Sequence, residues 1–569
     1  MAKLAAKKEM DSSQDSFSMT CSSIVSGVIS FFMLVLVTVF PLIYDKSYVN
    51  ILETKYKCFY MSILAMIVVL LVLSIVMLVV DLNEFGGQHA KMLFSAFAPK
   101  NWKTTFHVAD AAVLIFWVVC LISTLQSEYL FEAFWGNEGR FTGLFLITLY
   151  VAAYFIISRF WKLKGWVVQA FLIAGLVVCY IGITDYFQLD ILHFRGKIKP
   201  SQSTIFTSTI GNINTFTAYV ALVMGAATAL FTTSKGLLKS IWYYLCMVVA
   251  FFAIIMGCSD NAYLAIGALF AFLPFVLFKS KDGVVRYLVV LATFATVIQC
   301  IDYINQKFAE MVIGLDSLFK VLVNFGGLEF VVIALWAVTA GVWFACRLIS
   351  VGGIKLEDLG NVKTSAGLDD ERKGGNSGDF GNLLVYIWLG IVIAGALAVC
   401  FALYDANALG NSSRYGGLGK YLVFNDQWGT NRGYIWRKSI ELYRDFPVIH
   451  KLFGYGPDTF GILTTRYIMP EMNAVTGQTF DSAHNEYLQF LVTIGPFGLV
   501  GYVVFLAGSV WQMAKGWLKN PYVIGCMMAV LCYAFQALVN LNLPIATPLM
   551  WLLLAAGVGA ARSVAQKAM

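Results

Sequence analysis

One histidine, His484, stands where a polar segment of the sequence gives way to a long apolar run. It is the fourth residue of DSAHNEYL (481–488), and apolar residues continue to about Trp511. An ionisable side chain at a membrane boundary is costly unless it is satisfied or used. We expect Asp481 or Ser482 to cap the helix that begins here, with His484 in its first turn. The positive end of the helix dipole then favours neutral imidazole, the form that a general base requires, and a histidine that only caps the helix is the alternative.

A second candidate, Arg432, lies in a polar segment that precedes the histidine. The sequence NRGYIWRKSIELYR (431–444) has the period of an amphipathic helix. On that helix Arg432 shares a face with Trp436, whereas Arg437 and Glu441 lie on another face at a spacing that allows an ion pair. Arg432 therefore belongs to the face that packs inward, with no carboxylate beside it in the sequence. An inward arginine of this kind is a candidate ligand for an anion.

Other polar residues near apolar runs carry weaker signals. The turn LFGYGPD (452–458) is punctuated by glycine, and its backbone amides could approach a phosphate. Arg140 ends an acidic loop just before an apolar run, where it is either a ligand or an arginine that reaches to the interface. Asn214 begins another run and either caps that helix or contacts substrate.

The elements that must position these residues are membrane helices. The chain has 569 residues, of which 59% are hydrophobic and 13% charged, whereas soluble domains carry about 25% charged residues. We therefore expect an all-α polytopic membrane protein. Windows of about 20 apolar residues predict fourteen spans. They lie near 24–44, 58–80, 106–126, 141–158, 164–184, 213–232, 238–257, 261–278, 284–302, 325–347, 384–404, 485–511, 521–540 and 544–562.

Basic residues in short loops fix the expected orientation. Four such loops fall on the same side as the N-terminal lysines, and the positive-inside rule then puts both termini in the cytoplasm. The resulting segments are a cytoplasmic tail (1–23), spans 1–10 (24–347), a flexible cytoplasmic linker (348–383), span 11 (384–404), a long, partly helical extracytoplasmic loop (405–484), spans 12–14 (485–562) and a second cytoplasmic tail (563–569). Arg195, Lys197 and Lys199 fall outside against this bias, which is consistent with an anionic partner.

The composition gives no support for a metal centre or for nucleic-acid binding. The 11 cysteines lie mostly in apolar runs, without a CxxC pair or a Cys/His ligand spacing, so we expect neither disulfides nor a metal site. The net charge of +7 comes from basic residues that lie mainly in loops beside spans, where membrane orientation explains them. No nucleotide-binding glycine loop is present.

Several of these motifs together resemble the O-antigen ligase superfamily. The histidine segment HNEYL (484–488) is similar to the histidine motif of the family. The segment NRGYIW (431–436), followed by LFGYG (452–456), also resembles the family. GNEGRFTG (136–143) looks like its early arginine motif, and GNIN (211–214) resembles its asparagine motif. The resemblance extends over roughly 130–560. One departure is Ser259-Asp260-Asn261, where the family often carries an arginine after the serine.

The resemblance implies a type-C glycosyltransferase of the bacterial inner (plasma) membrane, with its active site outside the cytoplasm. Such enzymes move a glycan from undecaprenyl diphosphate to a hydroxyl of a lipid, a growing glycan or a protein, without cofactor, metal or ATP. By matching motif, His484 would activate the acceptor hydroxyl, and Arg432 and Arg140 would hold the diphosphate. The further candidate substrate-binding residues are Arg437, Asn214, Arg195 and Tyr487.

Other functions remain open from the sequence. A transporter or flippase of lipid-linked saccharides would also have many spans and external cations. It predicts charged residues at mid-membrane and broken helices in paired halves, and the sequence has few of the former and no clear internal repeat. A membrane scaffold leaves the inward arginine and the boundary histidine unexplained. Within the enzyme class, ligase, polymerase and protein O-oligosaccharyltransferase are not distinguished, and no residue identifies the sugar.

Overall fold

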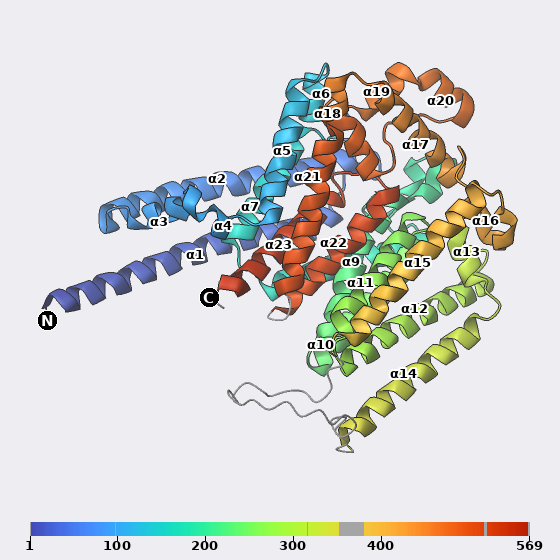
Figure 1. Ribbon diagram of the computed structural model, residues 1–569, viewed down its shortest axis with the longest axis horizontal. Helices are drawn as coiled ribbons and strands as arrows, with labels where there is room; N and C mark the ends of the chain where they lie inside the picture. Colours follow the sequence, from blue (N-terminus) through green and yellow to red (C-terminus); the bar gives the residue numbers. More distant parts are fainter. Residues whose placement is uncertain (1, 97, 316, 352–380, 517–519, 567–569) are drawn as a thin grey trace.

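The computed structural model describes residues 2–96, 98–315, 317–351, 381–516 and 520–566, and these are almost wholly helical (Figure 1). The helices are α1 (Ala2–Leu42), α2 (Ile51–Phe85), α3 (Gln88–Ala96), α4 (Trp102–Thr105), α5 (Val108–Leu125), α6 (Leu130–Trp135), α7 (Leu144–Phe160), α8 (Gly165–Tyr186), α9 (Ile213–Thr233), α10 (Leu237–Met256), α11 (Asn261–Leu277), α12 (Lys281–Lys307), α13 (Ser317–Val323), α14 (Leu328–Val351), α15 (Leu383–Asn407), α16 (Gly419–Leu422), α17 (Trp428–Asp445), α18 (Val448–Phe453), α19 (Phe460–Tyr467), α20 (Met469–Thr476), α21 (Glu486–Gly516), α22 (Pro521–Gln536) and α23 (Thr547–Gln566). Two short antiparallel strands, β1 (Phe206–Thr207) and β2 (Gly211–Asn212), precede α9.

The prediction of an all-α polytopic membrane protein is confirmed. Within the described residues, 11 helices are long and apolar enough to cross a membrane. Each of the fourteen expected runs coincides with one helix, but three of these helices are not among the 11. Two of the three, α7 and α11, are apolar but have only 17 residues each; the third is α23. Apolar runs therefore located the helices, and the expectation that all fourteen cross the membrane stays a prediction.

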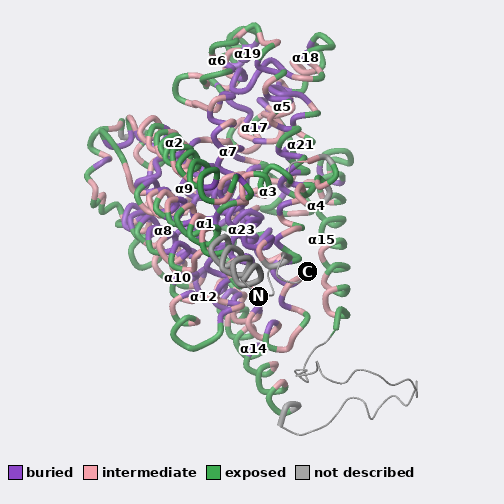
Figure 2. Tube along the Cα trace, turned by 90° about the vertical axis from the view of Figure 1, so that its left-hand side faces the viewer, coloured by how far each residue is buried: buried purple, intermediate pink, exposed green. Residues whose placement is uncertain are grey.

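The helices differ widely in how much of their surface is covered by protein. In α9, 94% of the most apolar window is buried, and α9 packs against both α10 and α22. In α15 none of that window is buried, and in α2 and α14 only 11% is. Figure 2 shows α2 and α15 as mostly exposed tubes beside the buried centre. Lipid accepts apolar side chains without cost, so α9 is the core of the helix bundle and the exposed helices face the bilayer.

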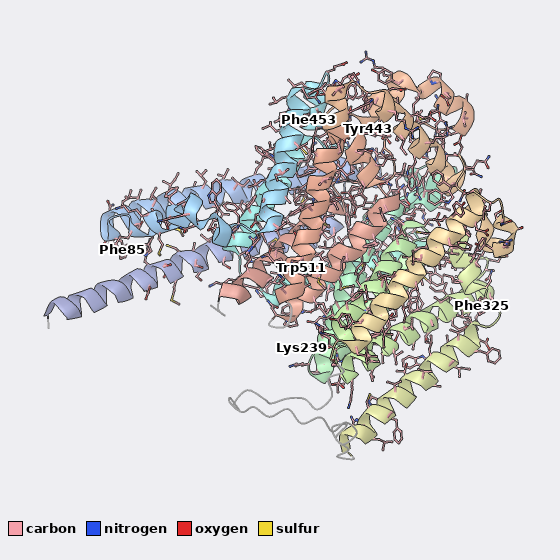
Figure 3. The ribbon with its side chains drawn as sticks, viewed as in Figure 1. Phe85, Lys239, Phe325, Tyr443, Phe453 and Trp511 are labelled. Atoms are coloured by element: carbon pink, nitrogen blue, oxygen red, sulfur yellow. The ribbon has the colours of Figure 1, made fainter. Side chains whose placement is uncertain are left out.

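The segment expected to be a long loop is a folded cap at one end of the molecule. Its helices α17 to α20 lie together above the ends of α5 and α21 (Figure 1), and they enclose a small core of their own that includes Tyr434, Phe460 and Met472. In Figure 3, Tyr443 and Phe453 mark this end, while Lys239 and Trp511 lie towards the other. The expected linker is not tested here, because residues 352–380 lie outside the described residues.

At the end remote from the cap, a buried charge cluster fixes three helices to one another. Asp110 of α5 accepts hydrogen bonds from Arg159 of α7 at 2.7 Å and from Arg562 of α23 at 2.5 Å. The hydroxyl of Tyr154, also on α7, donates to the same carboxylate at 2.8 Å. Because the carboxylate is fully buried, leaving any one of these groups without a partner would be costly. The cluster therefore sets the spacing of α5, α7 and α23.

The cap is joined to the membrane helices where α21 is interrupted. The interruption lies at Gly495, which has φ 73° and ψ 178° and is followed by Pro496. A Cβ on Gly495 would lie 2.1 Å from the carbonyl oxygen of Leu452, and a Cβ on Gly454 would lie 2.1 Å from the carbonyl carbon and oxygen of Thr493. Only glycine permits this close approach of two backbones, so these positions lock the cap to α21.

Replacing Gly495 by alanine tests this junction. The φ/ψ region of Gly495 is essentially restricted to glycine, so Gly495→Ala introduces roughly 1–3 kcal/mol of backbone strain in addition to the clash with Leu452. We expect a clear fall in the thermal unfolding midpoint of the detergent-purified protein. Gly267→Ala is the matched control, because a Cβ there meets nothing within 4 Å. Equal midpoints for the two variants would contradict the proposed lock.

Candidate active site

A cavity beneath the cap contains two of the predicted site residues, although they lie far apart in the sequence. His484 and Arg140 both line it, together with Ser482 and Asp458 from the cap and with side chains of α5, α7, α21 and α23. The cavity therefore lies between the polar cap and the apolar helix bundle. A lipid-linked polar headgroup would require these surroundings, since it must meet charged groups and a membrane interior together.

His484 does not lie in the first turn of α21, as the sequence suggested, but just before it. The cap of the helix is Asn485, whose Oδ1 accepts the backbone N–H groups of Tyr487 and Leu488, each at 3.0 Å. The expectation that Asp481 or Ser482 caps the helix is wrong, because Asn485 stands nearer and has a suitable short side chain. His484 has φ 47°, a left-handed backbone that is uncommon outside glycine and points to a constrained position.

The environment of His484 keeps its imidazole neutral. Burial, with the added positive charges of Arg432 and Arg140, lowers the pKa of His484 to about 3, and Asp481 opposes this only partly. Its Nδ1 atom is buried and has no hydrogen-bond partner within the described part of the chain. The predicted neutral form is therefore favoured, and its physical cause is burial beside two guanidinium groups, which the sequence argument from the helix dipole did not include.

Arg432 occupies the inward face predicted from helical spacing. The regular backbone of α17 begins with it, after positive φ values at Gly429, Thr430 and Asn431. Arg432 is 9% exposed, and its side chain makes no ion pair or hydrogen bond within the described residues. Burial lowers its pKa, and Asp260 is the carboxylate whose charge acts against this shift. At the departure noted above, Ser259-Asp260-Asn261, the carboxylate of Asp260 thus places a negative charge near Arg432. Asp260 does not contact Arg432, so the buried positive charge has no direct counter-ion.

Arg140 is held beside the histidine by an ion pair. Its Nε donates to Asp481 Oδ2 at 2.9 Å, and a second nitrogen of the guanidinium donates to Oδ1. The carboxylate of Asp481 is 63% exposed, so the pair adds little to stability, but its two-point geometry fixes the direction of the guanidinium. The neighbouring Phe141 stacks on Tyr56 of α2 at a centroid distance of 4.6 Å. The N-terminal helices therefore support the loop that carries Arg140.

Asp458 is a positioning residue that the sequence did not reveal. Its buried carboxylate accepts the backbone N–H groups of Asn137 at 2.7 Å and Thr142 at 3.0 Å, which ties the arginine loop to the glycine-rich turn. Burial raises the pKa of Asp458 to about 6. Two amides of the turn are not available to a phosphate, because Gly454 N–H donates to the carbonyl of His450 and Gly456 N–H donates to the carbonyl of Thr493.

Two further candidates make contacts within the protein. Arg437 forms ion pairs with Asp426 at 2.7 Å and with Glu441 at 2.8 Å, so the ion pair predicted from the spacing of Arg437 and Glu441 is present. The hydroxyl of Tyr487 donates to the carbonyl of Ala534 at 2.7 Å and so joins α21 to α22. Neither residue lines the cavity of His484.

The other two candidates also lie outside the lining of that cavity. Asn214 belongs to a buried amide network, in which its Oδ1 accepts from Ser259 at 2.6 Å and its carbonyl accepts from Asn261 at 2.8 Å. The guanidinium of Arg195 donates to the carbonyl of Asp185 at 2.9 Å. Asn214 and Arg195 therefore have structural partners, and their role in substrate binding stays a prediction.

Glu486, which sequence reasoning passed over, is fully buried beside the cavity. Its carboxylate accepts hydrogen bonds from Tyr502 at 2.7 Å, Asn542 at 3.1 Å and Tyr533 at 3.4 Å. The only signal in the sequence was a carboxylate at the start of an apolar run, directly after the histidine segment. Its hydrogen-bond donors come from remote positions, so the sequence could not identify them.

Residues 327–503 match the family model described as O-antigen ligase. The matched stretch contains Arg432, Asp458 and His484, whereas Arg140 lies outside it. The match supports the O-antigen ligase/polymerase superfamily, whose members act on glycans. No curated protein matches the chain in sequence.

The coupling through Asp458 is testable without an activity assay. Both backbone amides, of Asn137 and Thr142, donate to the same carboxylate oxygen of Asp458. Asp458→Asn replaces this charged acceptor with a weaker neutral one, so we expect faster hydrogen–deuterium exchange in peptides that cover 136–143. Mass spectrometry of the purified protein measures this. Glu138→Gln is the matched control, because Glu138 is exposed and lies in the same loop. Unchanged exchange in Asp458→Asn would show that the loop is held by other contacts.

Proposed function

We propose that the protein is a membrane glycosyltransferase of the O-antigen ligase/polymerase type. It transfers a glycan from an undecaprenyl-diphosphate-linked donor to an acceptor hydroxyl. The observation that carries this proposal is one buried, neutral imidazole that shares a cavity with the guanidinium of Arg140. A second guanidinium, that of Arg432, does not line the cavity, but its charge acts on the same imidazole and it has no counter-ion in direct contact. The match of residues 327–503 to O-antigen ligase supports the same class of reaction.

The charges of the site suit a diphosphate leaving group. Arg432 and Arg140 donate to the phosphate oxygens, where fixed cations in a buried site stabilise the negative charge that develops as the sugar departs. His484 takes the proton of the acceptor hydroxyl, and the acceptor oxygen attacks the anomeric carbon of the donor sugar. The bond from that carbon to the diphosphate oxygen breaks, and undecaprenyl diphosphate leaves with the electron pair. Attack opposite the leaving group inverts the anomeric centre.

Donor binding also makes His484 a better base. In the free protein, burial and then the two guanidinium charges disfavour a proton on the imidazole and hold its pKa far below the value a base needs near neutral pH. A bound diphosphate places negative charge against the same arginines, which offsets the part of the shift that the arginines cause. The pKa of His484 therefore rises when the donor is in place. The site becomes competent to deprotonate an alcohol only beside its leaving group, which limits wasteful reaction with water.

The distribution of charge supports an extracytoplasmic site. Lys239 belongs to one of the short basic loops, and it lies towards the end of the molecule remote from the cap (Figure 3). By the positive-inside rule that end faces the cytoplasm, together with both termini, and the cap faces outward from a bacterial plasma membrane. Lipid-linked glycans are assembled for export, so an outward-facing transferase meets donor and acceptor on one surface. Ligation to a lipid, polymerisation and transfer to protein all use the chemistry described here.

Removal of the base or of the unpaired cation tests the proposed reaction. We expect His484→Ala to lower glycan transfer by about 100-fold or more, the usual contribution of a general base. Arg432→Ala should reduce transfer at least as strongly, while Arg444→Ala, on an exposed position of the same helix, should not. The amounts of transferred glycan and of lipid-linked glycan are measured in membranes of a deletion strain that expresses each variant.

Near-normal transfer by a stable His484→Ala protein would refute the role of His484 as the general base. Movement of lipid-linked glycan across vesicle membranes without covalent transfer would indicate a transporter.

The pH dependence gives an independent test. A histidine whose pKa falls from 6.5 to about 3 stays neutral in the free protein down to acidic pH, and between those values the unfolded chain binds more protons than the folded one. Acidification thus lowers stability and does not charge His484. Once the donor is bound its pKa is higher, so we expect the acid-side ionisation in kcat to lie at higher pH than the one in kcat/KM for the donor. Coincident profiles centred near 6.5 would contradict this coupling.

A further inference from the structure

The cavity of His484 has a second part that the proposed chemistry does not use. On the side of the helix bundle it is lined by Tyr150 of α7, Trp551 of α23 and Asn542, which lies between α22 and α23. We refer to this part as the recess. Tyr150 Oη and Asn542 Oδ1 are both buried, and neither has a hydrogen-bond partner within the described residues. Buried polar groups are rarely left in this state unless a ligand or water completes them.

The amide of Asn542 is oriented by Glu486. Its Nδ2 donates to Glu486 Oε1 at 3.1 Å, and the same oxygen accepts the hydroxyl of Tyr502 at 2.7 Å. Turning the amide over would set its oxygen against the carboxylate, so the observed orientation is the favourable one. Asn542 Oδ1 is therefore available only as an acceptor. A ligand in the recess must offer a hydrogen-bond donor to it.

Aromatic rings form much of the remaining lining. Tyr150 stacks on Trp551 with a centroid distance of 5.4 Å and an angle of 10° between the rings. Phe116, Phe490 and Tyr502 also line the cavity, beside aliphatic side chains such as Ile147 and Leu541. A polyprenyl chain would match these apolar groups but would leave Tyr150 Oη and Asn542 Oδ1 without partners in an apolar environment, which is unfavourable. A ring with apolar faces and polar edges satisfies both features.

We propose that the recess binds the ring of a sugar, which donates a hydroxyl or acetamido hydrogen to Asn542 Oδ1 and shares a hydrogen bond with Tyr150 Oη. This inference rests on the proposed function and adds the groups that recognise the sugar. Two sources present the same chemistry. One is the first sugar of the donor, attached to the diphosphate at Arg140, and the other is the terminal sugar of the acceptor, whose hydroxyl reaches His484. Glu486 acts as a positioning residue, since it touches Asn542 and Tyr502 and fixes the amide.

Equilibrium binding to the full-length protein in lipid nanodiscs distinguishes these cases. The probes are undecaprenyl diphosphate without sugar, the native lipid-linked glycan extracted from a deletion strain, and the free glycan released from it by mild acid. If the donor sugar occupies the recess, we expect the lipid-linked glycan to bind about tenfold more tightly than the bare lipid, as one or two hydrogen bonds provide. Tyr150→Phe and Asn542→Leu should each remove much of that difference and leave affinity for the bare lipid unchanged.

If the acceptor sugar occupies the recess, the two lipids bind equally. The free glycan then binds saturably in the presence of the bare lipid, and the same two substitutions weaken that binding. Tyr180→Phe, which removes a hydroxyl from an exposed position on α8, should affect neither measurement. The thermal midpoint of the empty Tyr150→Phe protein should stay the same or rise, because the substitution deletes a buried hydroxyl that has no partner. A merely structural role for Tyr150 predicts a fall.

The two proposals fail in different ways. If the bare lipid binds and Arg432→Ala weakens it, but neither glycan probe responds to Tyr150→Phe or Asn542→Leu, the sugar site is refuted and the transferase stands. If Arg432→Ala leaves affinity for the bare lipid unchanged, the diphosphate site fails, and with it the proposed function.

Discussion

A buried positive charge without a direct counter-ion is the constraint on which this structure depends. Arg432 is almost fully enclosed, and Arg140 forms an ion pair with the largely exposed carboxylate of Asp481. Moving a guanidinium from water into a protein interior is expensive unless an anion accompanies it. The fold accepts this cost beside a histidine that is kept neutral by burial and by the same charges. An anionic ligand would therefore lower the electrostatic cost of the arginines and also of a proton on the imidazole.

Holding such a site together requires rigid connections between remote segments, because like charges repel one another. The connections are carboxylates and close backbone contacts. Asp481 orients Arg140, Asp458 binds the loop around it, and Gly454 and Gly495 bring the cap onto α21. At the far end, Asp110 fixes the helices that form the recess. The ion pair of Asp481 contributes little stability, but each of these contacts removes a freedom that would let the cations separate from the histidine.

The sequence was sufficient where a local period decides the outcome. Apolar windows located the helices, and helical spacing put Arg432 on the inward face of α17 and Arg437 next to Glu441. It failed where partners are remote. The roles of Asp458 and Glu486 follow from amides and hydroxyls elsewhere in the chain, which no local pattern encodes. The helix cap was misassigned because several polar residues in 481–485 can cap equally well, and tertiary packing selected Asn485.

The division of the site between segments suggests how its specificity can vary. Of the groups proposed to act in the chemistry, His484 and Arg432 lie within 327–503, the part that matches O-antigen ligase, and Arg140 lies before it. The groups that face the recess, Tyr150 and Asn542, come from helices and loops outside that stretch. Proton transfer and stabilisation of a diphosphate make the same demands for any sugar, whereas recognition of hydroxyl positions does not. Since Glu486 follows His484 closely and binds Asn542, the base and the recess are mechanically linked, so a change in the recess that moved Glu486 would also disturb the histidine.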